Sequence, residues 1–183
     1  MILALVLGGM LSAQAQHVQE SKFCSPFDFP ILLSANFGEL RPNHFHNGLD
    51  IKTQGVTGKP IHCIADGYVS RVAVLHGGYG QVIYVTHPDG LTSVYGHVIS
   101  FAKNIQACVR QYQYAHENVC VRPEIPARRI PGEERRHHCP ERQRRSSAGP
   151  HLHLELRRTE TGEYIDPDAV FQAYAEGQES ACR

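Results

Sequence analysis

Polar and apolar residues alternate through residues 151–156, His-Leu-His-Leu-Glu-Leu, and this alternation is the clearest structural signal in the chain. Successive side chains of a β-strand point to opposite faces of the sheet. The three leucines would therefore line a core, while His151, His153 and Glu155 would share the other face. The pattern predicts a half-buried strand that carries two imidazoles side by side.

Several more strands are expected upstream, because short runs rich in Val, Ile and Tyr alternate there with Gly, Pro and Asp turns. A hairpin signal at Asp66-Gly67 joins the first two of them. This spacing predicts an all-β domain, an antiparallel meander within a β-sandwich or open barrel-like fold. A short helix is expected after Asp168. The expected strands are 60–64, 68–75, 80–86 and 91–98.

The ends of the chain predict an exported protein with one folded domain. Residues 2–11 are apolar and precede an A-x-A pattern, so residues 1–15 are interpreted as a signal peptide, too short to anchor in a membrane. Its removal would leave no integral membrane segment, and export would place the protein in the periplasm or cell envelope. An extended segment (16–35), the domain (36–168) and a C-terminal tail (169–183) would follow.

Candidate metal ligands lie about a hundred residues before the His-x-His strand, at His46 and Asp50. Neighbouring Asn and Gly residues favour a turn leading into a strand rather than a helix. Zinc binds imidazole and carboxylate readily, and a catalytic zinc uses three protein ligands with one position open for water. Two histidines and one aspartate fit that pattern. Taken alone, however, the segment around His46 is equally compatible with a polar turn.

A third motif, Tyr95-Gly96-His97, places a tyrosine and a histidine two residues apart, the spacing at which side chains share one face of a strand. The motifs HxxxD, YxH and GPHLHxE, in this order, resemble the lysostaphin/LytM-type zinc metallopeptidases, which cut peptide bonds in bacterial peptidoglycan. The resemblance spans residues 36–168 and implies packed β-sheets with a groove across one face. By the same resemblance, His46, Asp50 and His153 are the ligands of one Zn²⁺, and His97 and His151 are the catalytic histidines.

The resemblance implies a zinc-dependent endopeptidase acting on peptidoglycan cross-links or stem peptides, with peptidoglycan peptides as its partners. Which of His97 and His151 acts as the general base stays open, and Tyr95 is interpreted as a packing residue rather than an oxyanion donor. Two alternatives remain: a catalytically inactive cell-wall-binding or regulatory domain of the same fold, and a peptidase for secreted proteins. Nothing in the pattern indicates an oligomeric state.

Residues 118–145 differ in composition from the rest of the chain, because they hold eight of its 14 arginines and no lysine. Read literally, they form a basic loop typical of anion binding. The back-translated codons of residues 130–145, read from their second base, permit Phe-Pro-Val-Lys-Lys-Gly-Asp-Ile-Ile-Ala-Leu-Ser-Gly-Asn-Glu-Gly at every position. This is a strand ending in a glycine turn, as the family resemblance requires. We therefore interpret residues 118–145 as a frameshifted segment.

The frameshift hypothesis changes how the charge of the chain is interpreted. The chain has 18 basic and 18 acidic residues, and omitting the eight arginines and four glutamates of this segment leaves 10 and 14, a net charge of −4. The basic run is then no sign of nucleic-acid binding, and no nucleic-acid partner is expected. If the segment is translated as written, we expect the His151–Glu155 strand to lose a hydrogen-bonded neighbour, with weak zinc binding, poor folding or no activity as the result.

Overall fold

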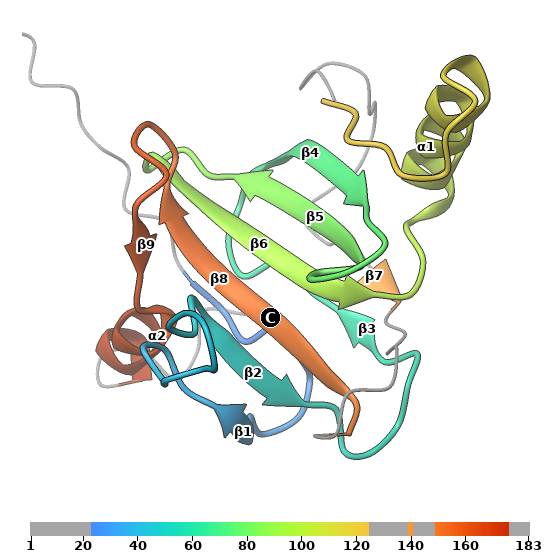
Figure 1. Ribbon diagram of the computed structural model, residues 1–183. Helices are drawn as coiled ribbons and strands as arrows, with labels where there is room; N and C mark the ends of the chain where they lie inside the picture. The colour runs from blue at the N-terminus through green and yellow to red at the C-terminus, as the bar shows by residue number, and fades with distance from the viewer. Residues whose placement is uncertain (1–22, 125–138, 141–148, 176–183) are drawn as a thin grey trace, which may run out of the picture.

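The computed structural model describes residues 23–124, 139–140 and 149–175 (Figure 1). The proposed signal peptide, the end of the tail and most of the anomalous segment lie outside these residues. A seven-stranded antiparallel sheet dominates the fold. Its strands are β1 (Leu33–Ala35), β2 (Leu49–Lys52), β4 (Tyr68–Val74), β5 (Gln81–Thr86), β6 (Leu91–Val98), β8 (His151–Arg158) and β9 (Tyr164–Ile165).

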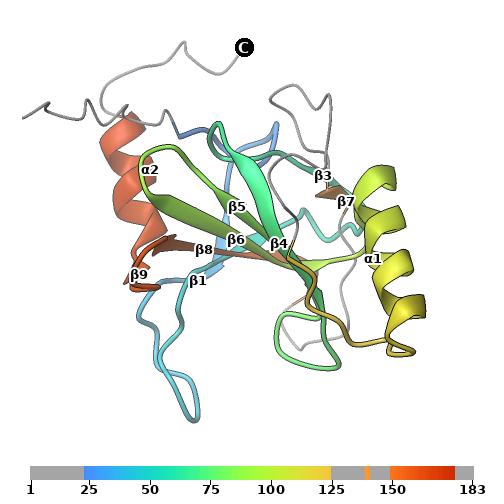
Figure 2. The same cartoon turned by 90° about the horizontal axis from the view of Figure 1, so that it is seen from above.

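Two helices and a second, two-stranded sheet complete the described fold. The small sheet pairs β3 (Pro60–Ile61) with β7 (Cys139–Pro140), and the helices are α1 (Lys103–Ala115) and α2 (Pro167–Ala175). Figure 2 shows the helices at opposite ends of the main sheet. In the part of the chain that the structure describes, no helix is long and apolar enough to cross a membrane. The predicted all-β, antiparallel class is confirmed, and so is the short helix after Asp168.

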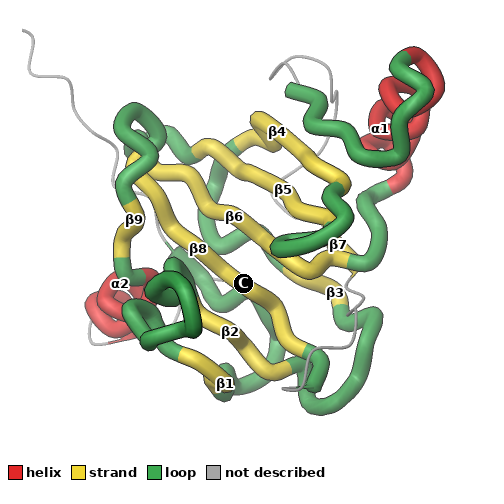
Figure 3. The backbone as a smooth tube through the Cα atoms, viewed as in Figure 1, coloured by secondary structure: helices red, strands yellow, loops and turns green. Residues whose placement is uncertain are grey.

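The strand order of the main sheet, β1-β2-β8-β6-β5-β4, places β8 between strands from two distant parts of the chain (Figure 3). The run β4-β5-β6 is the predicted meander. The neighbours of β8 are β2 and β6, and neither belongs to residues 118–145. The expectation that a literal 118–145 segment would deprive this strand of its partner is therefore wrong.

The hairpin predicted at Asp66-Gly67 is also wrong. Strands β3 and β4 flank that turn, but β3 pairs with β7 in the small sheet while β4 pairs with β5. Gly67 is nevertheless required there, since a Cβ at this position would stand 2.5 Å from the Thr86 carbonyl oxygen. A close approach of two backbones, rather than a hairpin, explains this glycine.

The core lies on the face of the sheet that the leucines of β8 were predicted to line. Leu152, Leu154 and Leu156 are fully buried there, and the core includes Ile51 of β2 and Ile105 of α1. The opposite face of β8 carries the two histidines and Glu155. The predicted alternation is confirmed along the strand, and it separates a hydrophobic face from a polar one.

A buried histidine outside the candidate site stabilises the turn after β5. His87 is 3% exposed, its Nδ1 donates to the Asp66 carbonyl at 2.8 Å, and its Nε2 lies 2.8 Å from Ser93 Oγ. Burial lowers the pKa of His87 below its ordinary value, so the folded protein holds this ring neutral.

Buried His87 should make the protein less stable in mild acid. Because the unfolded chain binds the proton more readily than the folded one, the stabilisation is complete above about pH 6.5 and is lost as the pH falls towards the lower pKa of the folded state. The slope attributable to one proton is at most about 1.4 kcal/mol per pH unit. Urea unfolding at pH 7.5 and 5.5 should show a larger loss for the wild type than for His87→Gln, and equal losses would contradict this.

Candidate active site

The first motif reaches the site through a turn that runs directly into β2. His46 precedes the strand and Asp50 lies on it, with Asp50 paired opposite His153 of β8. Side chains of directly opposed residues share a face and lie close together. The strand pairing thus brings together two residues that are 103 positions apart in the sequence. The predicted turn into a strand is confirmed.

Gly48 permits this turn to lie against β8. A Cβ at position 48 would stand 2.3 Å from the Leu154 carbonyl oxygen and 2.9 Å from the Cγ of Glu155. Both neighbours belong to the strand that carries His153, and the nearer one is backbone. Gly48, which lies between His46 and Asp50, is therefore a steric requirement of the site.

Gly48→Ala should consequently destabilise the fold by about 1–3 kcal/mol, the usual cost of inserting a methyl group into a packed region. It should also weaken metal binding, because relief of the overlap would separate β2 from β8. Chemical unfolding and zinc titration would measure both effects. Gly77→Ala is a matched control, since a Cβ there meets nothing within 4 Å. Unchanged stability and zinc affinity in Gly48→Ala would contradict the steric argument.

Three predicted ligands converge on one point. Candidate ligand atoms of His46, Asp50 and His153 all lie within 4.8 Å of one another, and all three residues are buried. His46 Nε2 is 3.2 Å from Asp50 Oδ1, and His153 Nδ1 is 2.9 Å from the same oxygen and 3.0 Å from His46 Nε2. Two imidazole nitrogens and one carboxylate oxygen therefore face a common centre, a donor set that suits zinc.

Each ligand is also oriented by a second contact on the side away from this centre. His46 Nδ1 donates to the Asn36 carbonyl oxygen at 2.7 Å, and Asp50 Oδ2 accepts from Arg41 Nη2 at 3.1 Å. Outer contacts of this kind fix the tautomer and the ring orientation of metal ligands. The orientation of His46 leaves Nε2, and not Nδ1, available to a metal.

His153 is oriented by a buried charged network that the sequence reasoning missed. Its Nε2 donates to Glu155 Oε1 at 3.0 Å, and the same oxygen accepts from the Tyr79 hydroxyl at 2.5 Å. Arg157 pairs with the other oxygen, Oε2, through Nη2 at 2.5 Å and Nε at 2.8 Å. Glu155 is only 1% exposed. The alternation of β8 had already placed Glu155 beside His153, and this was the available signal.

The electrostatics of the ligands favour a bound cation. Burial alone would raise the pKa of Asp50, but its hydrogen bonds with His153 and His46 hold that pKa far below its usual range. Burial lowers the pKa of His153, yet the contacts with Asp50 and Glu155 raise it overall to about 8. The raised pKa favours the protonated form of His153 at neutral pH, and a bound metal ion would take the place of that proton.

The two remaining histidines stand next to the ligands. The ring of His97 is centred 5.0 Å from that of His151 and 5.9 Å from that of His153. His151 Nδ1 donates to the Gly149 carbonyl oxygen at 3.0 Å, and its Nε2 lies 3.8 Å from Asp50 Oδ1. Burial, reinforced by electrostatic interaction with the neighbouring His151 and His153, lowers the pKa of His97 to about 4. All five predicted site residues are therefore brought together.

The prediction that Tyr95 and His97 share one strand face is wrong. Tyr95 is 2% exposed within the core, where its hydroxyl accepts from the Ile64 amide at 2.9 Å. His97 faces the site because its φ is +61°, and the β5–β6 register shifts between Gln81 and Ile83, as at a β-bulge. A left-handed non-glycine residue costs free energy and is found preferentially at functional sites. The bulge therefore turns His97 towards the ligands, and Tyr95 is a packing residue as interpreted.

Comparison with known proteins confirms the family resemblance. Residues 44–114 match the model of the family described as peptidase family M23. The matched segment contains His46, Asp50 and His97 and ends before the strand of His151 and His153. No curated protein sequence matches the chain.

Solved structures share the fold. A zinc-containing peptidase from Vibrio cholerae is 19% identical with a TM-score of 0.52, covering 80% of this chain and 39% of its own. The antimicrobial peptidase lysostaphin from Staphylococcus simulans is 15% identical with a TM-score of 0.55, covering 87% of this chain and 58% of its own. The match thus covers less than two thirds of either relative, and at these identities the likeness establishes the fold alone.

Proposed function

We propose, because residues 44–114 match the model of peptidase family M23, that the protein is a zinc-dependent endopeptidase that hydrolyses peptide bonds in peptidoglycan cross-links or stem peptides. The observation that carries the proposal is the convergence of the donor atoms of His46, Asp50 and His153 within 4.8 Å. The proposal includes export to the periplasm or cell envelope, where peptidoglycan lies.

The donor set fits zinc in number and in type. Three protein ligands leave a position for water, which is the arrangement of catalytic rather than structural zinc sites. When bound, zinc would lower the pKa of a coordinated water to ~7 and polarise the scissile carbonyl. His46, Asp50 and His153 would hold the ion, and their contacts with Asn36, Arg41 and Glu155 would keep the three ligands in place.

His97 and His151 are the residues left to move protons and to bind the reacting peptide. The low pKa of His97 keeps its ring neutral at pH 7, so it can accept a proton or share a hydrogen bond. The Gly149 contact at Nδ1 orients His151 so that Nε2 faces the ligands. Peptide hydrolysis needs a proton delivered to the leaving amine and donors for the developing oxyanion. We assign these two tasks jointly to His97 and His151.

An inactive binding domain is the second candidate, and the structure favours it less. A domain that only binds cell-wall peptides has no need for buried ligands with outer-shell contacts or for a histidine held at a left-handed φ. All five positions are occupied by the residues that the chemistry requires, and β8 keeps both strand partners even with residues 118–145 as written.

Digestion of purified peptidoglycan tests the proposal. The zinc-loaded chain should release primary amines, and mass spectrometry should identify products cut at peptide bonds with glycan strands intact. A chelator should stop the release, and added zinc should restore it. Asp50→Asn is the control for metal-dependent activity. New reducing sugar ends, or no new amines at all, would contradict the proposed reaction.

The frameshift hypothesis has a separate test, which is resequencing of the coding DNA across codons 116–147. A compensating pair of insertions and deletions is expected. One structural observation supports the hypothesis: Pro60 pairs with Pro140, and neither residue has an amide hydrogen to donate between β3 and β7. The shifted reading has leucine at position 140, which would supply a donor. Coding DNA incompatible with the shifted reading would refute the hypothesis.

A further inference from the structure

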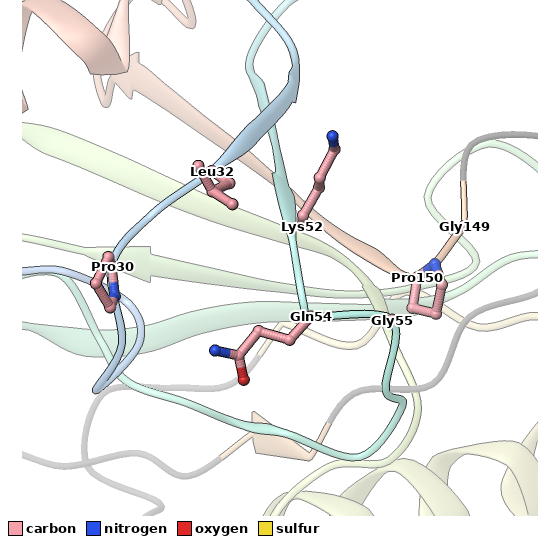
Figure 4. Close-up of a pocket in the computed structure, with 7 residues that line it drawn as sticks. All are labelled: Pro30, Leu32, Lys52, Gln54, Gly55, Gly149 and Pro150. Carbon is pink, nitrogen blue, oxygen red and sulfur yellow. The ribbon is translucent and has the colours of Figure 1, made fainter.

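A pocket of about 530 Å³ lies at the end of the sheet next to His151. Its lining comes from three separate segments, the one before β1, the end of β2 and the residues just before β8. Figure 4 shows Leu32 on one side of Lys52 and Pro150 on the other. None of the five candidate site residues is among the residues that line this pocket.

Strand pairing shows that the pocket opens on the same face of the sheet as the metal ligands. Lys52 is two residues after Asp50 on β2, so both side chains share a face. Lys52 is also paired directly with His151 of β8, and its amide donates to the Leu32 carbonyl oxygen at 2.8 Å. Leu32, Lys52 and His151 therefore form a row across three adjacent strand segments.

The pocket is physically coupled to the site as well as adjacent to it. Gly149 lines the pocket, and its carbonyl oxygen is the acceptor that orients His151. Two residues of a strand span ~6.6 Å, which sets the separation between Lys52 and the ligand Asp50 along β2. An extended peptide rises by about the same amount per two residues. A side chain in the pocket would thus belong to a residue about two positions from the cleaved bond.

The lining combines apolar surface with a cation. Leu32 is 66% exposed and supplies apolar surface to the pocket. Lys52 is exposed and makes no ion pair with the residues that the structure describes, and none of the described residues that line the pocket is acidic. A second cation lies at the rim, because Lys59 Nζ donates to Gln54 Oε1 at 3.1 Å.

We propose that this pocket is a substrate subsite for a peptide residue whose aliphatic side chain ends in a free carboxylate. Leu32 and Pro150 would contact the methylene groups, and the Lys52 ammonium would pair with the carboxylate. The proposal rests on the proposed function for the identity of the ligand as a peptide. It adds the chemical class of the residue that is recognised about two positions from the cleaved bond.

A matched peptide pair tests the subsite. The two peptides differ only in one residue, which ends in a carboxylate in one and in a carboxamide in the other, placed two positions from the cleavable bond. Affinity is measured by fluorescence anisotropy on the full chain. The wild type should bind the carboxylate form about three- to fivefold more tightly, as expected for one exposed ion pair. Lys52→Met should abolish the preference, Lys52→Glu should reverse it, and the distant Lys103→Met should retain it.

Equal affinity of the wild type for both peptides, or a preference that survives in Lys52→Met, would overturn the subsite. Cleavage of the carboxamide peptide separates this failure from a failure of the proposed function. If the subsite alone is wrong, the zinc-loaded wild type still cleaves both peptides without regard to charge. If neither peptide is bound or cleaved by any variant, both proposals are wrong.

Discussion

Replacement of His151 by alanine is expected to lower kcat for peptide-bond hydrolysis by about 10²- to 10⁴-fold, the usual contribution of a positioned general acid or base. His151 lies beside the three proposed metal ligands and is not part of that set, with Nε2 3.8 Å from Asp50 Oδ1. Zinc affinity should therefore be retained. A comparable loss is expected for His97→Ala, because its ring lies 5.0 Å from that of His151.

The kinetic loss is measured with a defined peptide substrate on protein of verified zinc content. His62→Ala is the matched control, because His62 pairs with exposed Asp28 away from the ligands, at 2.9 Å, and should leave kcat unchanged. The double replacement of His97 and His151 should cost less than the product of the two single losses, since residues that act together are not additive. Full activity in His151→Ala would remove this residue from the reaction.

Glu155→Gln should weaken zinc binding by about 10- to 100-fold, the usual effect of removing an outer-shell partner of a metal ligand. Glu155 accepts from His153 Nε2, which leaves Nδ1 for the metal, and its negative charge raises the basicity of the ring. Glutamine has nearly the same size but lacks the charge, and it can present an amide hydrogen to His153. The expected loss is therefore electrostatic and orientational rather than steric.

Competition with a zinc-binding dye measures this effect directly. Tyr79→Phe is the graded control, because it removes one hydrogen bond to Glu155 Oε1 and leaves the carboxylate in place. It should reduce zinc affinity less than Glu155→Gln does. Thermal unfolding without metal shows whether either variant has lost its fold. Wild-type zinc affinity in a folded Glu155→Gln protein would show that the network has no effect on the ligand.

The sequence could predict the polar face of β8 because alternation is a local property of the chain. The two-residue period of a strand is enough to predict that His151 and His153 share one face. The same period predicts that the leucines between them face the core, where they are buried. The choice of His46 and Asp50 required more, since their segment alone was equally compatible with a polar turn. The order of the three motifs, through the family resemblance, supplied that information.

What could not be predicted depends on non-local pairing and on backbone conformation. Strand β8 inserts between β2 and β6, although β6 is about fifty residues away in the chain, and no local pattern encodes this position. The left-handed φ of His97 could not be predicted from the sequence either, because it depends on the bulge between β5 and β6. Strict alternation therefore placed Tyr95 and His97 on one face, which was wrong.

The metal centre is tested most directly by the zinc content of the purified chain, measured by native mass spectrometry after zinc loading. The wild type should carry one zinc ion. Replacement of His46, Asp50 or His153 by alanine should remove the ion, while His97→Ala and His151→Ala should retain it. A wild-type chain without zinc, or a zinc ion that survives the loss of these three side chains, would contradict the assignment of the ligands.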